Sequence, residues 1–337
     1  MTSFKSYFRS HLKSNGNILL YLTVIALVLT LVIGISSGTG VYWDSKSETP
    51  VTTYRSTIDV PVVFLCLLAY IAPVLEFSFF KKRINLNCAY AMPISRCALG
   101  LVHYLTGAIT VLIPYTLSYF LNFILILTRG VQYYNLAPMI AHYFLCLLLG
   151  LAIYSMMVFA FNEANGTGDG ILFMILWSFV MLFAVLAMYG LISGTSYSHI
   201  FPFPWVLISK LTTSYQHLIE MTVPVYSGAR DFLQTPHCIF WIVIWSLLGI
   251  ASGIRFFLSF GKRRMEKTEE ISDSFFGYRV LIPYFAVTGM IVFPIFPIWV
   301  IFEILALIGY TIYRRGFHYK LSDIIVLLSL LVFLIFI

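Results

Sequence analysis

The fold of this chain is decided by residues 18–35, which read ILLYLTVIALVLTLVIGI. None of these residues is charged, and a helix that rises about 1.5 Å per residue brings them close to the thickness of a hydrocarbon core. A secretory signal has an apolar region of about 7–15 residues and a small-residue cleavage site. The following Ser36-Ser37-Gly38 offers no such site, so the sequence predicts a retained membrane span near the amino terminus.

The composition of the whole chain is that of a membrane protein. Of its 337 residues, 60% are hydrophobic and 10% are charged, and the mean hydropathy is +0.91. Soluble domains have about 45–50% apolar and about 25% charged residues. The 30 Phe and 22 Tyr residues, with Gly and Pro at ordinary frequency and without a period, exclude a disordered or collagen-like chain.

Further apolar runs of spanning length follow at residues 58–80, 99–127, 137–161, 171–193 and 238–260. The run 280–313 is too long for one crossing, because as a single helix it would measure about 51 Å. Basic residues flank both of its ends, and Pro294 and Pro297 lie where a helix would break, so we predict a hairpin. A last run, 324–337, predicts a further span. The expected fold class is all-α, a polytopic helical membrane protein with six core spans, a carboxy-terminal hairpin and one further span.

The distribution of positive charge predicts the orientation. If the amino terminus is cytoplasmic, 16 of the 21 Lys and Arg residues lie on the cytoplasmic side. The external ones are Lys46, Arg55, Arg129, Lys210 and Arg230. The positive-inside rule therefore favours a cytoplasmic amino terminus. The basic residues stand in short clusters between apolar runs and form no single basic face, which argues against a nucleic-acid partner.

The amino-terminal segment, residues 1–17, has the pattern of an amphipathic helix. Its aromatic face carries Phe4, Tyr7, Phe8, His11 and Leu12 at helical spacing. Its cationic face carries Lys5, Arg9 and Lys13. Such a helix is expected to lie flat on the bilayer as an interfacial domain before the first span. A simple positively charged anchor explains this segment equally well.

Two loops of the predicted six-span core, residues 18–260, differ from simple connections between spans. The cytoplasmic loop 80–98 is basic and partly apolar, with Pro93 at a helix restart, and is longer than a turn requires. It suits either a protein partner or an idle juxtamembrane loop. The external loop 194–237 is apolar enough to carry short helices that dip into the outer leaflet. A basic linker, 261–279, then leads to the additional spans in 280–337.

Motifs of enzyme chemistry are missing from the sequence. It contains neither a G-x-x-x-x-G-K-[ST] phosphate loop nor an H-E-x-x-H zinc motif. The five cysteines form no C-x-x-C pair, so a disulfide framework or cysteine zinc site is not expected. The histidines, which we interpret as packing or interfacial residues, are scattered without carboxylates at helical spacing: His103, His142, His199, His217, His237 and His318.

Two acidic residues lie inside apolar runs, where an ionisable group is costly and is often functional. Glu76 is close to Lys81 in sequence and is expected to extend toward the cytoplasmic surface. Glu303 lies about three helical turns from Arg314 and is a candidate for pairing with a neighbouring helix.

Two stretches resemble a known family. Met92-Pro93-Ile94-Ser95-Arg96, followed by Leu99 and His103-Tyr104-Leu105, is similar to the "LPISR…L…KYL" signature of type-2 ATP-binding-cassette exporter permeases. The basic stretch 260–267 resembles the "KRxxE" segment after the sixth span in a Gram-positive branch of that family. This chain has Met92 in place of leucine and His103 in place of lysine, and its spans after residue 280 exceed the family's six.

The resemblance implies a transport function. The chain would be a permease subunit in a bacterial cytoplasmic membrane that pairs with a second permease, identical or different. Aromatic residues in its spans, such as Trp177, Phe183 and Trp245, favour a peptide, lipid or drug-like substrate, although such residues also pack helices in any membrane protein. The chain would hold no cofactor, because ATP and Mg²⁺ would bind a separate ATPase subunit. The resemblance assigns ATPase coupling to the amphipathic segment and the 80–98 loop, with the following residues: Phe4, Phe8, Lys82, Arg83, Tyr90, Met92, Pro93, Ile94 and Arg96.

Two other functions remain open. A secondary transporter would use ionisable groups within the spans, for which Glu303 is the main candidate. A membrane subunit for immunity or sensing would have the same hydropathy pattern as a permease but would not be coupled to ATP. The missing motifs argue against a membrane-embedded enzyme.

Overall fold

The chain is mainly helical. A computed structural model describes residues 4–36, 39–43, 50–54, 57–91, 94–128, 136–193, 204–220, 236–262, 270–272, 274–293 and 295–336. The chain forms two compact units that are interleaved in sequence. The first unit comprises Met1–Glu76, Met92–Val158 and Pro204–Lys262, and the second comprises Phe77–Ala91, Phe159–Phe203 and Arg263–Ile337.

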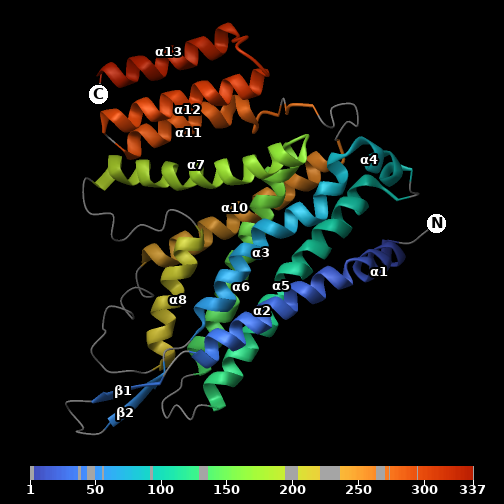
Figure 1. The fold of residues 1–337 in the computed structure, drawn as a ribbon, viewed down its shortest axis with the longest axis vertical. Coiled ribbons are helices and arrows are strands. Elements are labelled where there is room, and N and C mark those ends of the chain that lie inside the picture. Colours follow the sequence, from blue (N-terminus) through green and yellow to red (C-terminus); the bar gives the residue numbers. More distant parts are fainter. Residues whose placement is uncertain are drawn as a thin grey trace. The chain divides into compact units, whose positions relative to one another are not determined.

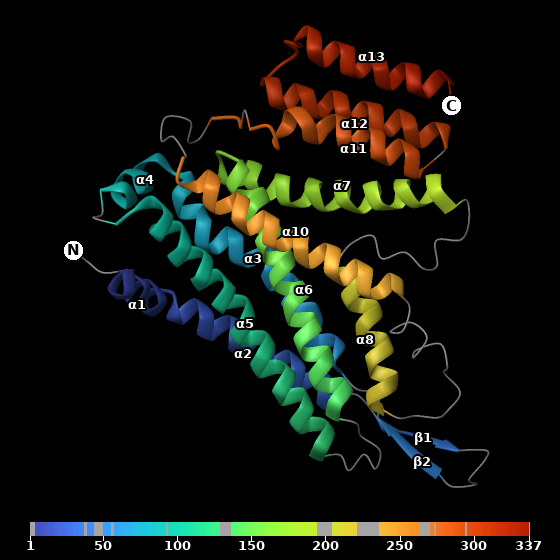
Figure 2. The ribbon, with the colours of Figure 1, turned by 180° about the vertical axis from the view of Figure 1, so that it is seen from behind.

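The first unit is a helical bundle with a small hairpin. Its helices are α1 (Phe4–Ser14), α2 (Gly16–Ser36), α3 (Asp59–Phe77, through Glu76), α5 (Arg96–Thr128), α6 (Leu136–Glu163, through Val158), α8 (Pro204–Glu220) and α10 (Pro236–Phe260). The helices α2 and α5 lie side by side along most of their length (Figures 1 and 2). Small residues permit close packing within this unit, since Gly150 faces Leu65 and Gly34 faces Leu125.

The hairpin lies in the 36–57 segment. Strands β1 (Thr39–Trp43) and β2 (Pro50–Tyr54) pair antiparallel, with Thr39 opposite Tyr54 and Trp43 opposite Pro50. The sequence analysis predicted no strands between the apolar runs 18–35 and 58–80. Thr, Val, Tyr and Trp favour a pleated strand, so the composition fits the observed pairing.

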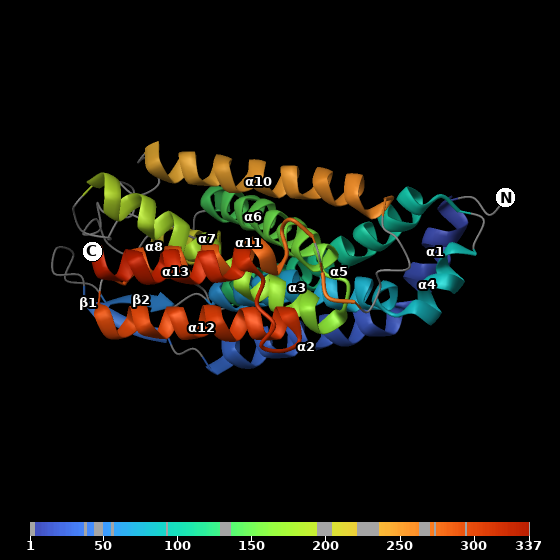
Figure 3. The same ribbon diagram turned by 90° about the horizontal axis from the view of Figure 1, so that it is seen from above.

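The second unit contains the short 3₁₀ helix η1 (Ser78–Lys81) and α4 (Arg83–Tyr90), the end of α6, and a stack of four helices. The stack comprises α7 (Thr167–Ser193), α11 (Tyr278–Val292), α12 (Phe296–Arg314) and α13 (Leu321–Phe336). Figure 3 shows α12 and α13 running side by side. Aromatic residues fill the core, with Phe183 in contact with Phe285 and Phe302.

The predicted break in the 280–313 run is confirmed. Helix α11 ends at Val292 and α12 begins at Phe296. Pro297 lies in the first turn of α12, where its missing N–H has no intrahelical acceptor to lose. Pro294 lies outside the described residues. After α12, Arg315 ends the helix in the left-handed conformation with φ 54°.

Within the described residues, seven helices are long and apolar enough to cross a membrane: α2, α3 with η1, α5, α6, α7, α10 and α12. The apolar helices α11 and α13 are shorter. Exposed apolar side chains such as Leu20, Val24 and Val28 cover α2, as expected for a surface that faces lipid. The prediction of a polytopic helical membrane protein is confirmed at this level.

Two segments outside the predicted spans contain helices, as their sequences predicted. Residues 4–14 form α1, with Lys5, Arg9 and Lys13 exposed and with Tyr7 and Phe8 half-buried. The 194–237 segment carries a helix, α8, on which Trp205 is exposed.

Candidate functional site

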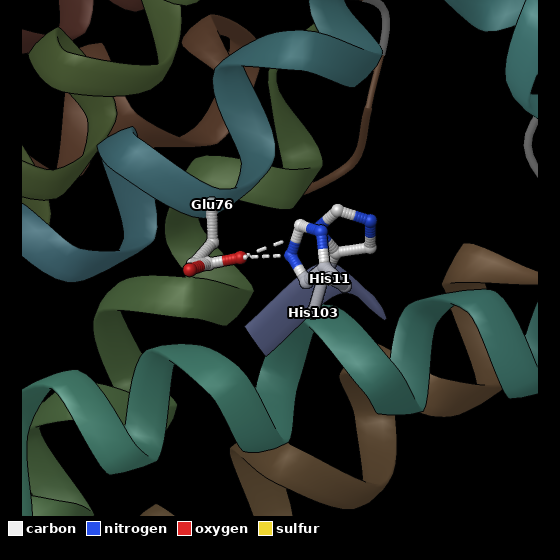
Figure 4. A group of neighbouring side chains, drawn as sticks. All are labelled: His11, Glu76 and His103. Atoms are coloured by element: carbon white, nitrogen blue, oxygen red, sulfur yellow. Dashed lines mark hydrogen bonds and ion pairs between the residues drawn. The ribbon is translucent and has the colours of Figure 1, made fainter. Parts of the chain in front are cut away.

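Polar side chains from three helices of the first unit converge at one point. Helix α1 contributes His11, α3 contributes Glu76 one residue before its end, and α5 contributes His103 about two turns after its start. Figure 4 shows both imidazole rings directed at the Glu76 carboxylate. We call His11, Glu76 and His103 the His-Glu-His cluster.

Both histidines approach the same carboxylate oxygen. His11 Nε2 lies 2.9 Å and His103 Nδ1 lies 3.2 Å from Glu76 Oε2. The two imidazole rings also contact each other, with their centroids 4.1 Å apart. Each of the three residues offers one ligand atom, and these atoms all lie within 4.8 Å of one another.

Neighbouring side chains orient the cluster. Asn15 donates a hydrogen bond of 2.9 Å from Nδ2 to the other carboxylate oxygen, Glu76 Oε1. The hydroxyl of Tyr7 lies 3.5 Å from His103 Nε2. Tyr7, His11 and Asn15 are spaced by four residues, which places them on one face at the start of the chain. Tyr7 and His11 of α1, with Asn15 directly after its end, therefore supply polar partners to Glu76 and His103.

The cluster is shielded from water. The Glu76 side chain is 3% exposed and the His103 side chain 5%, whereas that of His11 is 16% exposed. A buried carboxylate is costly unless it is paired and hydrogen-bonded, and here both of its oxygens have donors. Burial, and secondly the Glu76 carboxylate, raise the pKa of the Tyr7 hydroxyl above its ordinary value.

The expectation that Glu76 extends toward the surface beside Lys81 was wrong. Glu76 is buried and held by His11, His103 and Asn15. In the second unit, Lys81 donates instead to the main-chain carbonyls of Phe161 and Asn162. Glu76 and Lys81 therefore do not pair with each other, because each has hydrogen-bond partners that are distant in sequence.

The sequence analysis missed the cluster because it treated the histidines as separate packing residues. The signal present in the sequence was the repeat of Tyr7, His11 and Asn15 every four residues on a face that is otherwise apolar. For His142, the interpretation as a packing residue is confirmed, since it is buried and lies 2.9 Å from the Tyr119 hydroxyl.

The residues assigned to ATPase coupling are divided between the two units. In the first unit Phe4 is exposed, Phe8 stacks on Phe4, Ile94 is half-buried, and Arg96 is exposed at the start of α5. In the second unit Lys82 is exposed, Arg83 begins α4 and lies 3.6 Å from the Glu270 carboxylate, and Tyr90 ends α4. Met92 and Pro93 lie outside the described residues.

Glu303, the second acidic residue predicted to lie inside a span, is on α12 and is half-buried. The described part of the chain gives its buried Oε2 atom no hydrogen-bond partner. The predicted pairing with a neighbouring helix is therefore not present among these residues.

A separate apolar cavity lies between α3 and α8 in the first unit. Its volume is about 400 Å³. Val62, Leu67, Tyr70, Trp205 and Ile208 contribute to its lining, with Asp59 and Thr212 as polar members.

Comparison with known proteins does not assign the chain to a family. No protein-family model matches the chain, and no curated protein matches it.

Proposed function

We propose that this chain is the permease subunit of an ATP-binding-cassette exporter, as its resemblance to type-2 permeases implies. In this proposal the amino terminus is cytoplasmic, and α2, α3, α5, α6, α7 and α10 are the six core spans. The hairpin α11–α12 and helix α13 are additional membrane segments. The membrane is the bacterial cytoplasmic membrane.

The observation that carries the proposal is the link between α1 and two spans. Through the His-Glu-His cluster, α1 contacts the end of α3 and the start of α5. These spans flank the 80–98 loop in sequence, and α1 also packs along α5. A force applied to α1 or to the loop would therefore reach the same two spans. An ATPase that docks on this side could shift the conformational equilibrium through differential contacts with the two states.

The energy for transport is assigned to a partner. The sequence has no phosphate-binding loop, so ATP and Mg²⁺ would bind a separate ATPase subunit. A second permease, identical or different, would complete the translocation path. The exposed Lys82 and Arg96 supply charge for docking of the ATPase.

The apolar cavity favours an apolar or amphipathic substrate. Small-molecule sites are concave, mainly apolar and supplied with a few polar groups, and the cavity between α3 and α8 has this character. A peptide, a lipid or a drug-like molecule fits this description.

Purification from native membranes tests the proposal. The tagged chain would be isolated in mild detergent, its companions identified and ATPase activity measured. We expect a stoichiometric ATPase with a phosphate-binding loop. A chain that purifies alone and without ATPase activity would contradict the proposal and favour a secondary transporter or a non-coupled subunit, with Glu303 as the first residue to replace.

A further inference from the structure

We propose that His11, Glu76 and His103 bind a divalent transition-metal ion, with zinc as the best fit. This inference goes beyond the transport function and does not depend on it, because metal binding is measured on the chain itself. The ion would join α1, α3 and α5 at one point.

The donor set fits zinc. Two imidazole nitrogens and one carboxylate oxygen form a set that binds Zn²⁺ with a fourth position left for water. Imidazole nitrogen suits zinc, copper, iron and nickel, whereas magnesium and calcium prefer oxygen ligands. The cluster therefore selects for a transition metal.

The spacing of the ligand atoms also fits. In a tetrahedral site with metal–ligand distances of about 2.0–2.1 Å, the ligand atoms are about 3.3–3.4 Å apart. Here Glu76 Oε2 lies 2.9 Å from His11 Nε2 and 3.2 Å from His103 Nδ1. All three atoms lie within 4.8 Å of one another. The two distances to Glu76 Oε2 therefore differ from the tetrahedral value by a few tenths of an ångström.

The surrounding side chains are those that support metal ligands. A histidine ligand usually hydrogen-bonds through its second ring nitrogen, and a carboxylate ligand is itself hydrogen-bonded. Tyr7 lies at the second nitrogen of His103, and Asn15 donates to the second oxygen of Glu76. His11 is the most exposed of the three ligands and offers a route for the ion from water.

The test uses the full chain, purified in detergent and stripped of metal with a chelator. Zinc binding is measured by equilibrium dialysis, and Co²⁺ serves as a spectroscopic probe because its absorption distinguishes four-coordinate from six-coordinate sites. We expect one tightly bound ion per chain and a four-coordinate Co²⁺ spectrum. A chain that binds no ion would overturn the proposal.

Two conservative variants keep the hydrogen bonds and remove the metal ligands. In His11→Gln the amide nitrogen replaces Nε2, and in His103→Asn it replaces Nδ1, so each can still donate to Glu76. We expect zinc affinity to fall by more than tenfold in each. Asn15→Ala, which removes a supporting hydrogen bond, should weaken binding by about tenfold. His318→Ala, at an exposed histidine of the second unit, should bind as the unsubstituted chain does.

Unchanged binding in both ligand variants would place the ion elsewhere and overturn the proposal. X-ray absorption on the unsubstituted zinc-loaded chain gives an answer even if a variant fails to fold. Two imidazoles with oxygen ligands support the site, whereas sulfur ligands would assign the zinc to cysteine and refute it.

Discussion

The side-chain nitrogen of Lys81 lies 2.7 Å from the main-chain carbonyl oxygen of Phe161. Lys81 also donates to the carbonyls of Asn162 and Ala164, and its ammonium lies over the Phe161 ring. These carbonyls belong to the last turn of α6 and the residue after it, where the helix has no N–H donors of its own. A buried lysine therefore caps the carboxy-terminal end of α6. Its positive charge also interacts favourably with the negative end of the helix dipole.

Replacing this lysine should destabilise the second unit. Lys81→Met keeps the apolar stem and leaves buried carbonyls without a donor, so we expect a loss of about 2–3 kcal/mol in the free energy of unfolding. The measurement is denaturation of the purified chain in mixed micelles. The neighbouring Lys82 is exposed, and Lys82→Met should change stability by less than about 0.5 kcal/mol. Equal effects of the two substitutions would show that the cap does not contribute.

A bidentate ion pair between Arg314 and Asp323 connects α12 and α13. Arg314 Nε and Nη2 lie 2.7 and 2.9 Å from the two oxygens of Asp323, and Asp323 also accepts from the main-chain N–H of Lys320. We expect Asp323→Ala to cost about 1.5–3 kcal/mol in the free energy of unfolding. Arg314→Lys should also be destabilising, because lysine cannot form the fork. Lys320→Ala, which alters only an exposed side chain, is the control, and a cost as large as that of Asp323→Ala would argue against the pair.

Close packing of α10 on α6 depends on Gly249. A Cβ atom at this position would lie 2.6 Å from the Cα of Ala152, so the helices would have to separate. We expect Gly249→Ala to lower the free energy of unfolding by about 1–3 kcal/mol. Gly253, one turn later, has only the Tyr104 hydroxyl at an ordinary 3.6 Å. Gly253→Ala should therefore be neutral or slightly stabilising, and a similar loss in both variants would count against a specific contact.

Glu303 should be a source of instability in the isolated chain. Its buried Oε2 has no hydrogen-bond partner within the described residues, and a buried polar group without a partner is costly. We expect Glu303→Leu to raise the free energy of unfolding by about 1–2 kcal/mol in detergent. A decrease would instead indicate that the carboxyl group has a stabilising partner, such as a second subunit.

Charge reversal tests the proposed coupling residues. Lys82 and Arg96 are both exposed, so Lys82→Glu combined with Arg96→Glu should leave the fold and membrane insertion intact. If these residues contact the ATPase, transport should fall by at least tenfold while ATP hydrolysis continues. Reversal of another exposed cation, Arg279→Glu, is the control. If the double variant transports substrate at the rate of the unsubstituted chain, the 80–98 loop has no role in coupling.

Much of the fold follows from local sequence. Long apolar runs predict helices because a chain in lipid must satisfy its main-chain hydrogen bonds internally, and a helix does so within one segment. The proline pair predicts the break between α11 and α12 for an equally local reason. The hairpin at residues 39–54 was missed because its strands are five residues each and gain their hydrogen bonds only from each other.

The candidate site was less accessible from sequence. Periodicity placed Tyr7 and His11 on one face of a helix and hydropathy placed Glu76 inside a span, but neither shows which helices meet. His11 and Glu76 are separated by 65 positions, and Glu76 and His103 by 27. The repeat of Tyr7, His11 and Asn15 marks a polar stripe on the first helix, but it does not identify the residues that the stripe contacts.

The sequence by itself determined a polytopic helical membrane protein with an amphipathic start and a helix break before Phe296, because these features depend on neighbours along the chain. The tertiary structure alone decided that Glu76 binds His11 and His103 and that Lys81 caps α6. Such contacts depend on the rotation and register of packed helices. The rotation and register of the helices are set by the fit of whole surfaces and not by any single segment.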